Sequence, residues 1–262
     1  MPSPDAPPAA PTRLTLLGST HTADDDDLAR LYAYPDAQTP CVRANFIASI
    51  DGGATLAGRS GGLAGPGDRT LFMLLRSLAD VIVVGAGTVR VENYGGVQLS
   101  PAQLRQRQQR GQAGLPRLAV VTKSGNLDPD MRVFTTSQSP PLVATCTAAA
   151  ATTRERLAGV ADVVDCSAED PERVDEAAVL AAVSAGGHHR VLTEGGPMLL
   201  SSFIEADLLD ELCLTVAPYL VGGQARRIAT GPGQAHTAMH CAHLLTDDAG
   251  YLYARYTKNT RR

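Results

Sequence analysis

Hydrophobic residues occur along this chain in short, nearly continuous runs, separated by segments in which they recur every three or four positions. The runs Val81–Gly85, Leu118–Thr122 and Leu142–Thr145 have the composition of strands that are buried on both faces of a sheet. Between such runs, the segment from Asp68 to Ala79 carries leucines at helical spacing. The alternation predicts an α/β domain with a mostly parallel sheet at its centre.

The same signals predict the remaining elements of this core. An acidic run after Thr22, Asp24–Asp27, is suited to the cap and first turn of a helix, where carboxylates meet the positive end of the helix dipole. Pro197 stands at a favoured first helical position. Further strands are predicted at Cys41–Ala48, Val163–Asp165 and Val191–Glu194, and further helices near Pro101–Arg110, Ala148–Leu157 and Asp175–Ala185.

The pattern changes near the C-terminus, where strands follow one another without helices of any length. Asp210–Ala217, Arg226–Ala229 and Tyr251–Lys258 are the predicted strands, and they indicate antiparallel additions at one edge of the sheet. No internal repeat or linker divides the chain. We therefore expect a single domain over residues 13–262, preceded by a disordered, proline-rich arm at residues 1–12.

Composition narrows the class of protein. The chain has 262 residues, of which 44% are hydrophobic and 19% charged, and its net charge of −4 gives no basic footprint for nucleic acid. No apolar stretch has the length of a membrane span, and the N-terminus lacks a signal-peptide pattern. The five cysteines are widely spaced, with no C-x-x-C pair and no zinc-deaminase motif. We expect a cytoplasmic protein with reduced thiols.

Two glycine-rich turns that follow predicted strands carry the first sign of function. In one, the run from Val81 ends in Gly85-Ala-Gly87, and Thr88 is suited to cap a helix; in the other, the strand ending at Glu194 leads into Gly195-Gly-Pro-Met. Backbone N–H groups at such turns, with the positive end of a helix dipole, can bind an anion. Two of them in one α/β domain predict a phosphate-bearing cofactor.

Three other motifs occur only in part or without the neighbouring residues that their function requires. An ordinary Rossmann fingerprint requires a third glycine where this chain has Arg90. Gly58–Gly62 matches the G-x-S-x-G of a nucleophile elbow, but the residues after it cannot start a helix at once. The segment His236–His243 has histidines four apart, as on a metal-binding helix, but no second ligand cluster accompanies them. We therefore expect neither a hydrolase nor a metal site.

Several motifs occur together in the order found in one enzyme family. They are Ala48-Ser-Ile-Asp51-Gly52, Leu75-Arg76 before Ala79–Thr88, Val120-Val-Thr122 and Thr193–Pro197. With them, residues 42–256 resemble the reductase domain of bacterial riboflavin biosynthesis, most closely a stand-alone actinobacterial form. The resemblance implies a three-layer, dihydrofolate-reductase-like α/β fold, with a mixed, mostly parallel central sheet and antiparallel C-terminal strands.

The resemblance also implies NADPH as cofactor, a homodimer, and reduction of 5-amino-6-(5-phosphoribosylamino)uracil to 5-amino-6-(5-phosphoribitylamino)uracil. It places Ala48 beside the nicotinamide, and Thr122 with Lys123 near the adenosine ribose and its 2′-phosphate. The cofactor-binding residues that it implies are Ala48, Asp68, Gly85, Gly87, Thr88, Val89, Glu92, Thr122, Lys123, Gly195, Gly196, Pro197, Met198 and Leu199.

Substrate chemistry calls for a carboxylate near the reacting sugar and a grip on the phosphate. Glu194 and Asp51 both end predicted strands, so both can face one cleft; Glu194 is the first candidate for the catalytic contact and Asp51 the alternative. The family match places Arg76 at a substrate position, where a guanidinium suits a phosphate. The full substrate-binding set is Asn45, Ser60, Arg69, Arg76 and Asn93.

Because the chain departs from the family pattern at several positions, the identity of its substrate is not decided by the sequence. Many members carry Asp-Asp-Pro where this chain has Glu92-Asn93-Tyr94, and a lysine frequent on the first strand corresponds to Asn45. One alternative is reduction of dihydrofolate or another pterin, which uses a carboxylate on the helix that Asp68 opens. Another is a sensor that binds NADPH without turnover, although such a sensor would not need Asp51, Arg76 and Glu194 together.

Overall fold

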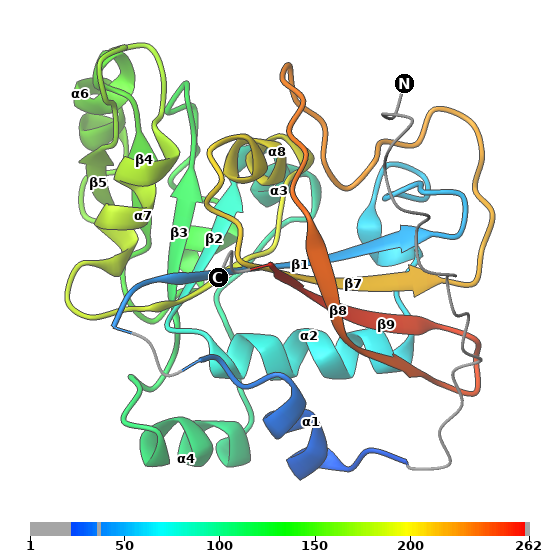
Figure 1. Cartoon of the computed structure of the whole chain (residues 1–262). Helices are drawn as coiled ribbons and strands as arrows, with labels where there is room; N and C mark the ends of the chain where they lie inside the picture. The colour runs from blue at the N-terminus through cyan, green and yellow to red at the C-terminus, as the bar shows by residue number, and fades with distance from the viewer. Residues whose placement is uncertain (1–21, 36–37, 260–262) are drawn as a thin grey trace, which may run out of the picture.

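A nine-stranded sheet forms the centre of the part of the chain that the computed structural model describes, residues 22–35 and 38–259 (Figure 1). Its strand order is β5-β4-β3-β2-β6-β1-β7-β9-β8. Pairing is parallel from β5 through to β7, and β9 and β8 add to β7 as an antiparallel hairpin. The strands are β1 Cys41–Ser49, β2 Val81–Gly85, β3 Arg117–Val121, β4 Leu142–Thr145, β5 Asp162–Asp165, β6 Arg190–Thr193, β7 Glu211–Ala217, β8 Met239–Thr246 and β9 Leu252–Lys258.

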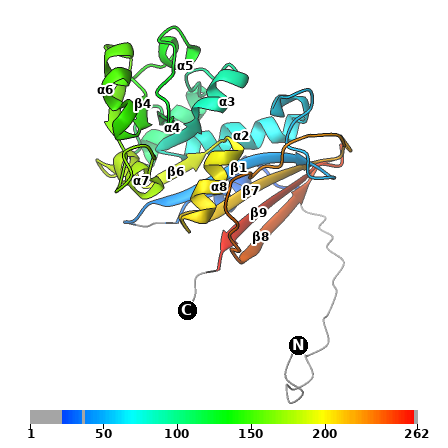
Figure 2. The same ribbon diagram turned by 90° about the horizontal axis from the view of Figure 1, so that it is seen from above.

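Helices cover both faces of the sheet, so the described chain has three layers. On one face, Ile82 and Val84 pack with Leu75 of α2 and Val89 of α3; on the other, Val81 and Val83 pack with α7 and α8. Figure 2 shows the sheet between α2 and α8. The helices are α1 Asp25–Leu31, α2 Pro66–Leu78, α3 Ala86–Val91, α4 Pro101–Gln109, α5 Arg132–Thr135, α6 Thr147–Arg156, α7 Glu176–Ser184 and α8 Pro197–Glu205. A 3₁₀ turn spans Ser60–Gly62.

The fold predicted from the sequence is confirmed in its layers, its parallel core and its antiparallel C-terminal strands. Asp24 caps α1 as expected, through the Asp27 N–H at 2.8 Å. The expected single domain stays a prediction, and the disordered arm at residues 1–12 lies outside the described residues.

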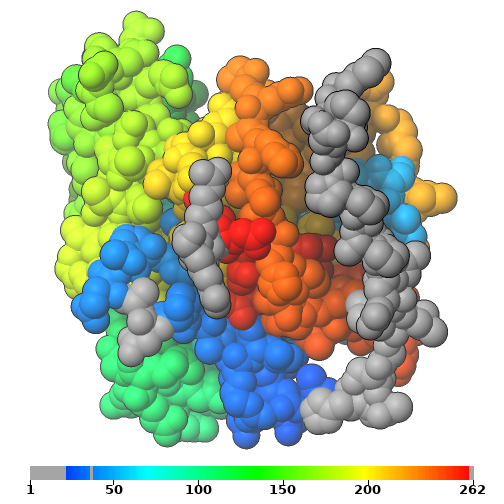
Figure 3. Space-filling model, viewed as in Figure 1, coloured from blue at the N-terminus to red at the C-terminus, as the bar shows by residue number. Residues whose placement is uncertain are grey.

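Two local predictions were wrong. Arg226–Ala229 forms no strand, and the outer partner of β9 is instead β8, which contains His240 and His243. β8 lies at the sheet edge with most residues exposed, and its orange atoms lie on the surface in Figure 3. An edge strand without a buried face lacks the alternation that reveals a strand. The cap of α3 is Gly85, and Thr88 lies inside that helix.

A buried charge cluster joins α1 to the sheet. Glu211 on β7 accepts hydrogen bonds from Arg43 Nε at 2.6 Å and Arg255 Nη2 at 2.7 Å. The two arginines also donate to the carbonyl oxygens of Tyr32 and Leu31, at the end of α1. Burial by itself would raise the pKa of Glu211, but the two arginines hold that pKa below its ordinary value.

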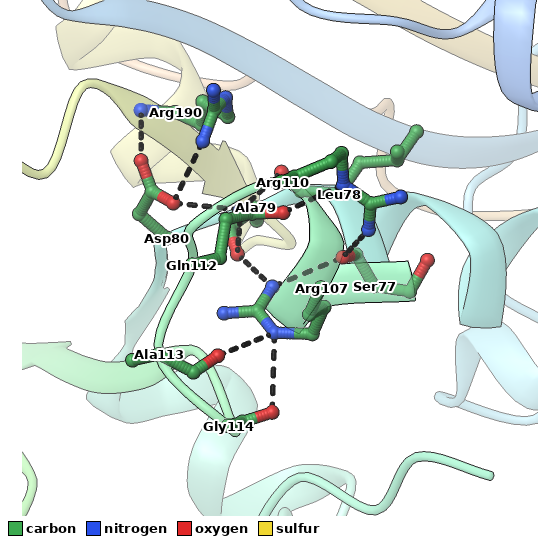
Figure 4. A network of polar contacts seen from close by, with 10 residues as sticks. All are labelled: Ser77, Leu78, Ala79, Asp80, Arg107, Arg110, Gln112, Ala113, Gly114 and Arg190. Atoms are coloured by element: carbon green, nitrogen blue, oxygen red, sulfur yellow. Dashed lines mark hydrogen bonds and ion pairs between the residues drawn. The ribbon is translucent and has the colours of Figure 1, made fainter. Parts of the chain in front are cut away.

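A second polar network fixes the C-terminal end of α2 (Figure 4). Arg107 and Arg110 donate to the Ser77 carbonyl, and Gln112 donates to the Leu78 carbonyl, so these helix-end acceptors are satisfied by side chains. Gln112 also donates to Asp80, which accepts from the Arg190 N–H at 3.0 Å. The end of α2 and the start of β6 are thereby held together.

We expect Glu211→Gln to lower the free energy of unfolding by about 3 kcal/mol, because two buried arginines lose their counter-charge. Urea denaturation measures this loss. Since the folded pKa of Glu211 lies below its ordinary value of 4.5, its contribution is present above that pH and disappears as the pH falls through the folded pKa. The difference in the free energy of unfolding between wild type and variant should therefore become smaller in acid. Glu155→Gln, on an exposed site of α6, is the control; a gap that does not depend on pH would contradict this account.

Candidate functional site

One large cleft lies where several parallel strands end. Its volume is about 2160 Å³, and its wall includes residues 45–47 of β1, the last residues of β2 and β3, and Glu194 after β6. Helices α2, α3 and α8 contribute further residues, as does the loop between β7 and β8. A cleft at the carboxyl ends of parallel strands is the usual place for a ligand in an open α/β sheet.

The two glycine-rich turns identified in the sequence touch each other in this cleft. The Gly85 N–H donates to the Gly195 carbonyl at 2.7 Å. A Cβ atom at Gly85 would lie 3.3 Å from the Gly196 nitrogen, and one at Gly196 would lie 2.7 Å from Thr88 Oγ1. Gly195 has a φ of +121°, a backbone conformation that residues with a side chain rarely adopt. Glycine is therefore required for the turns to meet.

The turns leave backbone open to the cleft, as a phosphate-bearing cofactor requires. Gly87 lines the cleft, and a Cβ atom added there would meet no atom within 4 Å. Helix α8 starts after Gly196 without a side-chain cap, and Pro197 to Leu199 line the same wall. Free amides at the start of a helix attract anions. The residues present thus fit a dinucleotide cofactor.

Glu194 is held in the cleft by an arginine and a tyrosine. Arg76 Nε donates to Glu194 Oε1 at 2.8 Å and Arg76 Nη2 to Oε2 at 2.7 Å, a bidentate ion pair. The Tyr94 hydroxyl donates to Oε2 and accepts from Arg76 Nη2 at 2.6 Å. The Glu194 side chain is 3% exposed and that of Arg76 11%. Both carboxylate oxygens of Glu194 therefore carry donors.

The environment of this cluster keeps Arg76 charged and Tyr94 neutral. Burial by itself would lower the pKa of Arg76, but Glu194 and Tyr94 raise it above its ordinary value. Burial, with the negative charge of Glu194, raises the pKa of Tyr94 well above its ordinary value. The guanidinium also lies over the Phe72 ring, 4.0 Å from its centre. The tyrosine accordingly acts as a hydrogen-bond donor at every working pH.

Asp51, the alternative carboxylate, has a different position. It is exposed and does not line the cleft; its carboxylate accepts hydrogen bonds from Ser49 Oγ and from the N–H groups of Val221 and Gly222. These bonds lower the pKa of Asp51 to about 2. Asp51 thus fastens the end of β1 to the loop after β7, as expected for a residue of an Asp-Gly turn.

Most of the other residues predicted for the site line the cleft. Ser60 donates to Glu92 Oε1 from its N–H and its hydroxyl, at 2.9 and 3.0 Å. The predicted residues in the wall are Asn45, Ser60, Asp68, Arg69, Arg76, Gly85, Gly87, Thr88, Glu92, Thr122, Lys123, Glu194, Gly195, Gly196, Pro197, Met198 and Leu199. Those outside the wall are Ala48, Asp51, Val89 and Asn93.

Asp68 is a second carboxylate in the cleft, in the first turn of α2. Burial raises its pKa above the ordinary value, although a hydrogen bond with Thr215 and the charge of Arg69 act in the opposite direction. Glu194 faces a cation, whereas Asp68 is mainly desolvated. The cleft therefore holds two carboxyl groups in opposite environments.

Tyr94 and Phe72 were missed in the sequence. Tyr94 stands in the segment that departs from the family pattern, and this departure was the available signal; Phe72 had none beyond helical spacing. Asn93, predicted to bind substrate, lies outside the cleft wall and has a φ of +50°. Asparagine tolerates this left-handed conformation, which turns the chain directly before Tyr94.

Two further observations concern the described residues only. No group of three or more histidine, cysteine, aspartate or glutamate side chains is arranged there to hold a metal ion. No helix in that part of the chain has the length and apolar character needed to cross a lipid bilayer.

Sheet topology defines an α/β protein with a cleft at the carboxyl ends of its parallel strands, and comparison with known proteins assigns the family. Residues 40–253 match the model of the RibD C-terminal domain, so the chain belongs to this family. The predicted resemblance is confirmed.

Relatives with reductase names align over most of the chain. A 2,5-diamino-6-ribosylamino-4(3H)-pyrimidinone 5′-phosphate reductase of Archaeoglobus fulgidus is 29% identical over 71% of this chain and 83% of its own length. A pyrimidine reductase-like protein of Corynebacterium diphtheriae has a solved structure that is 30% identical, with a TM-score of 0.75, over 85% of this chain and 93% of its own. The riboflavin biosynthesis reductase of Saccharomyces cerevisiae, 16% identical with a TM-score of 0.62 over 88% and 97%, shares the fold.

We expect Arg76→Met to lower the free energy of unfolding by about 3 kcal/mol, because the buried Glu194 carboxylate loses its cation. Adding Glu194→Gln should recover part of the loss, since no unpaired charge then remains buried. Denaturant titrations of both single variants and the double variant measure this coupling. Arg69→Met, on an exposed site of the same helix, should change stability by less than about 0.5 kcal/mol. Additive losses in the double variant would contradict the pairing.

Proposed function

We propose that this protein is an NADPH-dependent reductase that converts 5-amino-6-(5-phosphoribosylamino)uracil to 5-amino-6-(5-phosphoribitylamino)uracil. The observation that carries the proposal is the contact of the two glycine turns in one cleft with Glu194 directly beside them, in a chain of the RibD C-terminal domain family. Relatives from two archaea are named as reductases of a ribosylaminopyrimidinone phosphate. Their substrate has an amino group on the ring where the uracil has an oxygen.

In this reaction a bound nicotinamide would supply a hydride to the first carbon of the opened sugar, and the nitrogen of the C=N bond would take up a proton as that bond becomes single. The chain would hold the cofactor and orient the substrate. Gly87, Thr88 and the start of α8 would hold the pyrophosphate, and Lys123, exposed at the end of β3, would meet the 2′-phosphate. Glu194 would accept hydrogen bonds from the substrate and so orient the reacting carbon.

The arginines of α2 would bind the substrate phosphate. Two nitrogens of Arg76, Nε and Nη2, donate to Glu194. A phosphate contact by Arg76 would therefore use Nη1, and Arg69, which is exposed in the same wall, offers a whole guanidinium.

A homodimer in the cytoplasm completes the proposal. Support for the dimer comes from β8, an edge strand whose open side can pair with a second chain, with Leu244 exposed on it. A cytoplasmic location accords with a phosphorylated intermediate and NADPH as reactants. Analytical ultracentrifugation of the purified protein measures the oligomeric state.

We expect the purified protein to oxidise NADPH when the phosphoribosylaminouracil is added, as followed by the loss of NADPH absorbance. Parallel reactions contain the 2-amino pyrimidinone phosphate or dihydrofolate. Faster turnover of the 2-amino ring would move the substrate to that of the archaeal relatives, and turnover of dihydrofolate alone would refute the proposal. Tight NADPH binding without any turnover would point to a sensor.

We expect Glu194→Gln to bind NADPH as wild type does and to lower kcat by about 10- to 100-fold, the range for losing a charged hydrogen-bond acceptor. Cofactor fluorescence titration and steady-state kinetics separate the two quantities. Asp51→Asn is the matched control, a carboxylate at a strand end outside the cleft wall. An unchanged kcat in Glu194→Gln, or an equal loss in Asp51→Asn, would remove Glu194 from its assigned role.

A further inference from the structure

Glu194 depends on a residue that no motif assigns. Two side chains satisfy its carboxylate, Arg76 from α2 and Tyr94 from the segment after α3. The arginine provides charge and fixes the plane of the carboxylate through a two-point contact. The tyrosine adds a second donor on Oε2 alone, so the two oxygens of Glu194 are not equivalent.

The hydroxyl of Tyr94 is fully committed between the two charged groups. It accepts a hydrogen bond from Arg76 Nη2 at 2.6 Å and donates one to Glu194 Oε2. With the bond from Arg76 to Glu194, the three side chains form a closed cycle of hydrogen bonds. Tyr94 is 9% exposed and lies in the cleft wall. A buried hydroxyl with one acceptor and one donor role holds its partners in a single arrangement.

The backbone on both sides of Tyr94 leaves the ring little freedom. The Tyr94 N–H donates to the Val89 carbonyl at 3.0 Å, directly after the left-handed residue Asn93. Gly96 then packs so closely on the α5 end that a Cβ atom would lie 2.2 Å from the Thr136 carbonyl oxygen. The ring position is thus set by the chain before any ligand binds.

Among the described residues, the side-chain hydrogen bonds and the ion pair recorded for the Glu194 carboxylate come from Arg76 and Tyr94. The residues next to it in the sheet follow from the strand registers and are Asn45 on β1 and Val84 on β2, both uncharged. The segment that follows begins with Gly195 and Gly196. The orientation of the Glu194 side chain therefore depends on Arg76 and Tyr94.

We propose that Tyr94 is a positioning residue that, together with Arg76, holds the Glu194 carboxylate in the orientation in which it accepts hydrogen bonds from the substrate. The proposal rests on the reductase function proposed above. Because Oε2 already accepts two donors, the remaining lone pair of Oε1 is the one best directed at a substrate hydroxyl or N–H.

Tyr94→Phe tests this, because it removes the hydroxyl and keeps the ring beside Arg76. Without this donor the Glu194 carboxylate loses one of the two side chains that orient it, so kcat should fall about three- to tenfold. In a Glu194→Gln background the same substitution should change kcat by less than about twofold, because the group that Tyr94 positions is already altered. Affinity for NADPH should not change.

Tyr34→Phe is the matched control, because its hydroxyl donates to the Val191 carbonyl and the residue does not line the cleft. It should leave kcat unchanged even if the two variants lose similar stability in urea. An unchanged kcat in Tyr94→Phe, or an equal loss of kcat from this substitution in the Glu194→Gln background, would overturn the positioning role. Wild-type turnover is measured first: absence of any wild-type turnover refutes the reductase function itself and is thereby distinguished from failure of the Tyr94 assignment.

Discussion

The ion pair between Arg76 and Glu194 is the constraint on which the site depends. It joins two elements that lie 118 residues apart in the chain, α2 and the end of β6, at 2.7 Å between Arg76 Nη2 and Glu194 Oε2. Since both side chains are nearly buried, neither charge can be left alone without a large cost. The relative position of α2 and β6 is therefore fixed by chemistry as well as by hydrophobic packing, and this position sets one wall of the cleft.

Hydrogen bonds at the ends of α2 and β6 help to hold these two elements in place, and with them the ion pair. Arg107, Arg110 and Gln112 satisfy the carbonyl groups of the two residues that follow Arg76 at the end of α2. At the opposite end of β6 from Glu194, Asp80 binds the backbone and the side chain of Arg190. Each partner of the pair thus stands on an element whose end is held by polar contacts. A ligand that enters the cleft meets a carboxylate whose orientation is already determined, and this lowers the cost of ordering it during binding.

Much of the fold could be predicted from the sequence because parallel strands buried on both faces are continuous apolar runs. β2 and β4 were placed at their observed bounds for this reason. The edge strand β8 escaped, since its exposed residues give no hydrophobic period, and Arg226–Ala229 was placed as a strand on composition alone. In the site, glycine turns and strand-end carboxylates were visible as motifs. The hydroxyl of Tyr94 was not, because its position depends on the turn at Asn93 and on contacts 100 residues away.

The two sides of the cleft differ in how strictly the sequence constrains them. On the proposed cofactor side, Gly85, Gly195 and Gly196 have such close neighbours that a Cβ atom at any of them would not fit without displacement. Backbone geometry therefore requires the glycine motifs that the proposed cofactor site uses. The side chains that we propose for substrate recognition, such as Asn45 and Arg69, can change while the fold remains. Membership of the family therefore carries more information about the proposed cofactor than about the pyrimidine ring. In the proposed reaction Glu194 contacts the sugar, so recognition of the ring would require other side chains of the cleft wall.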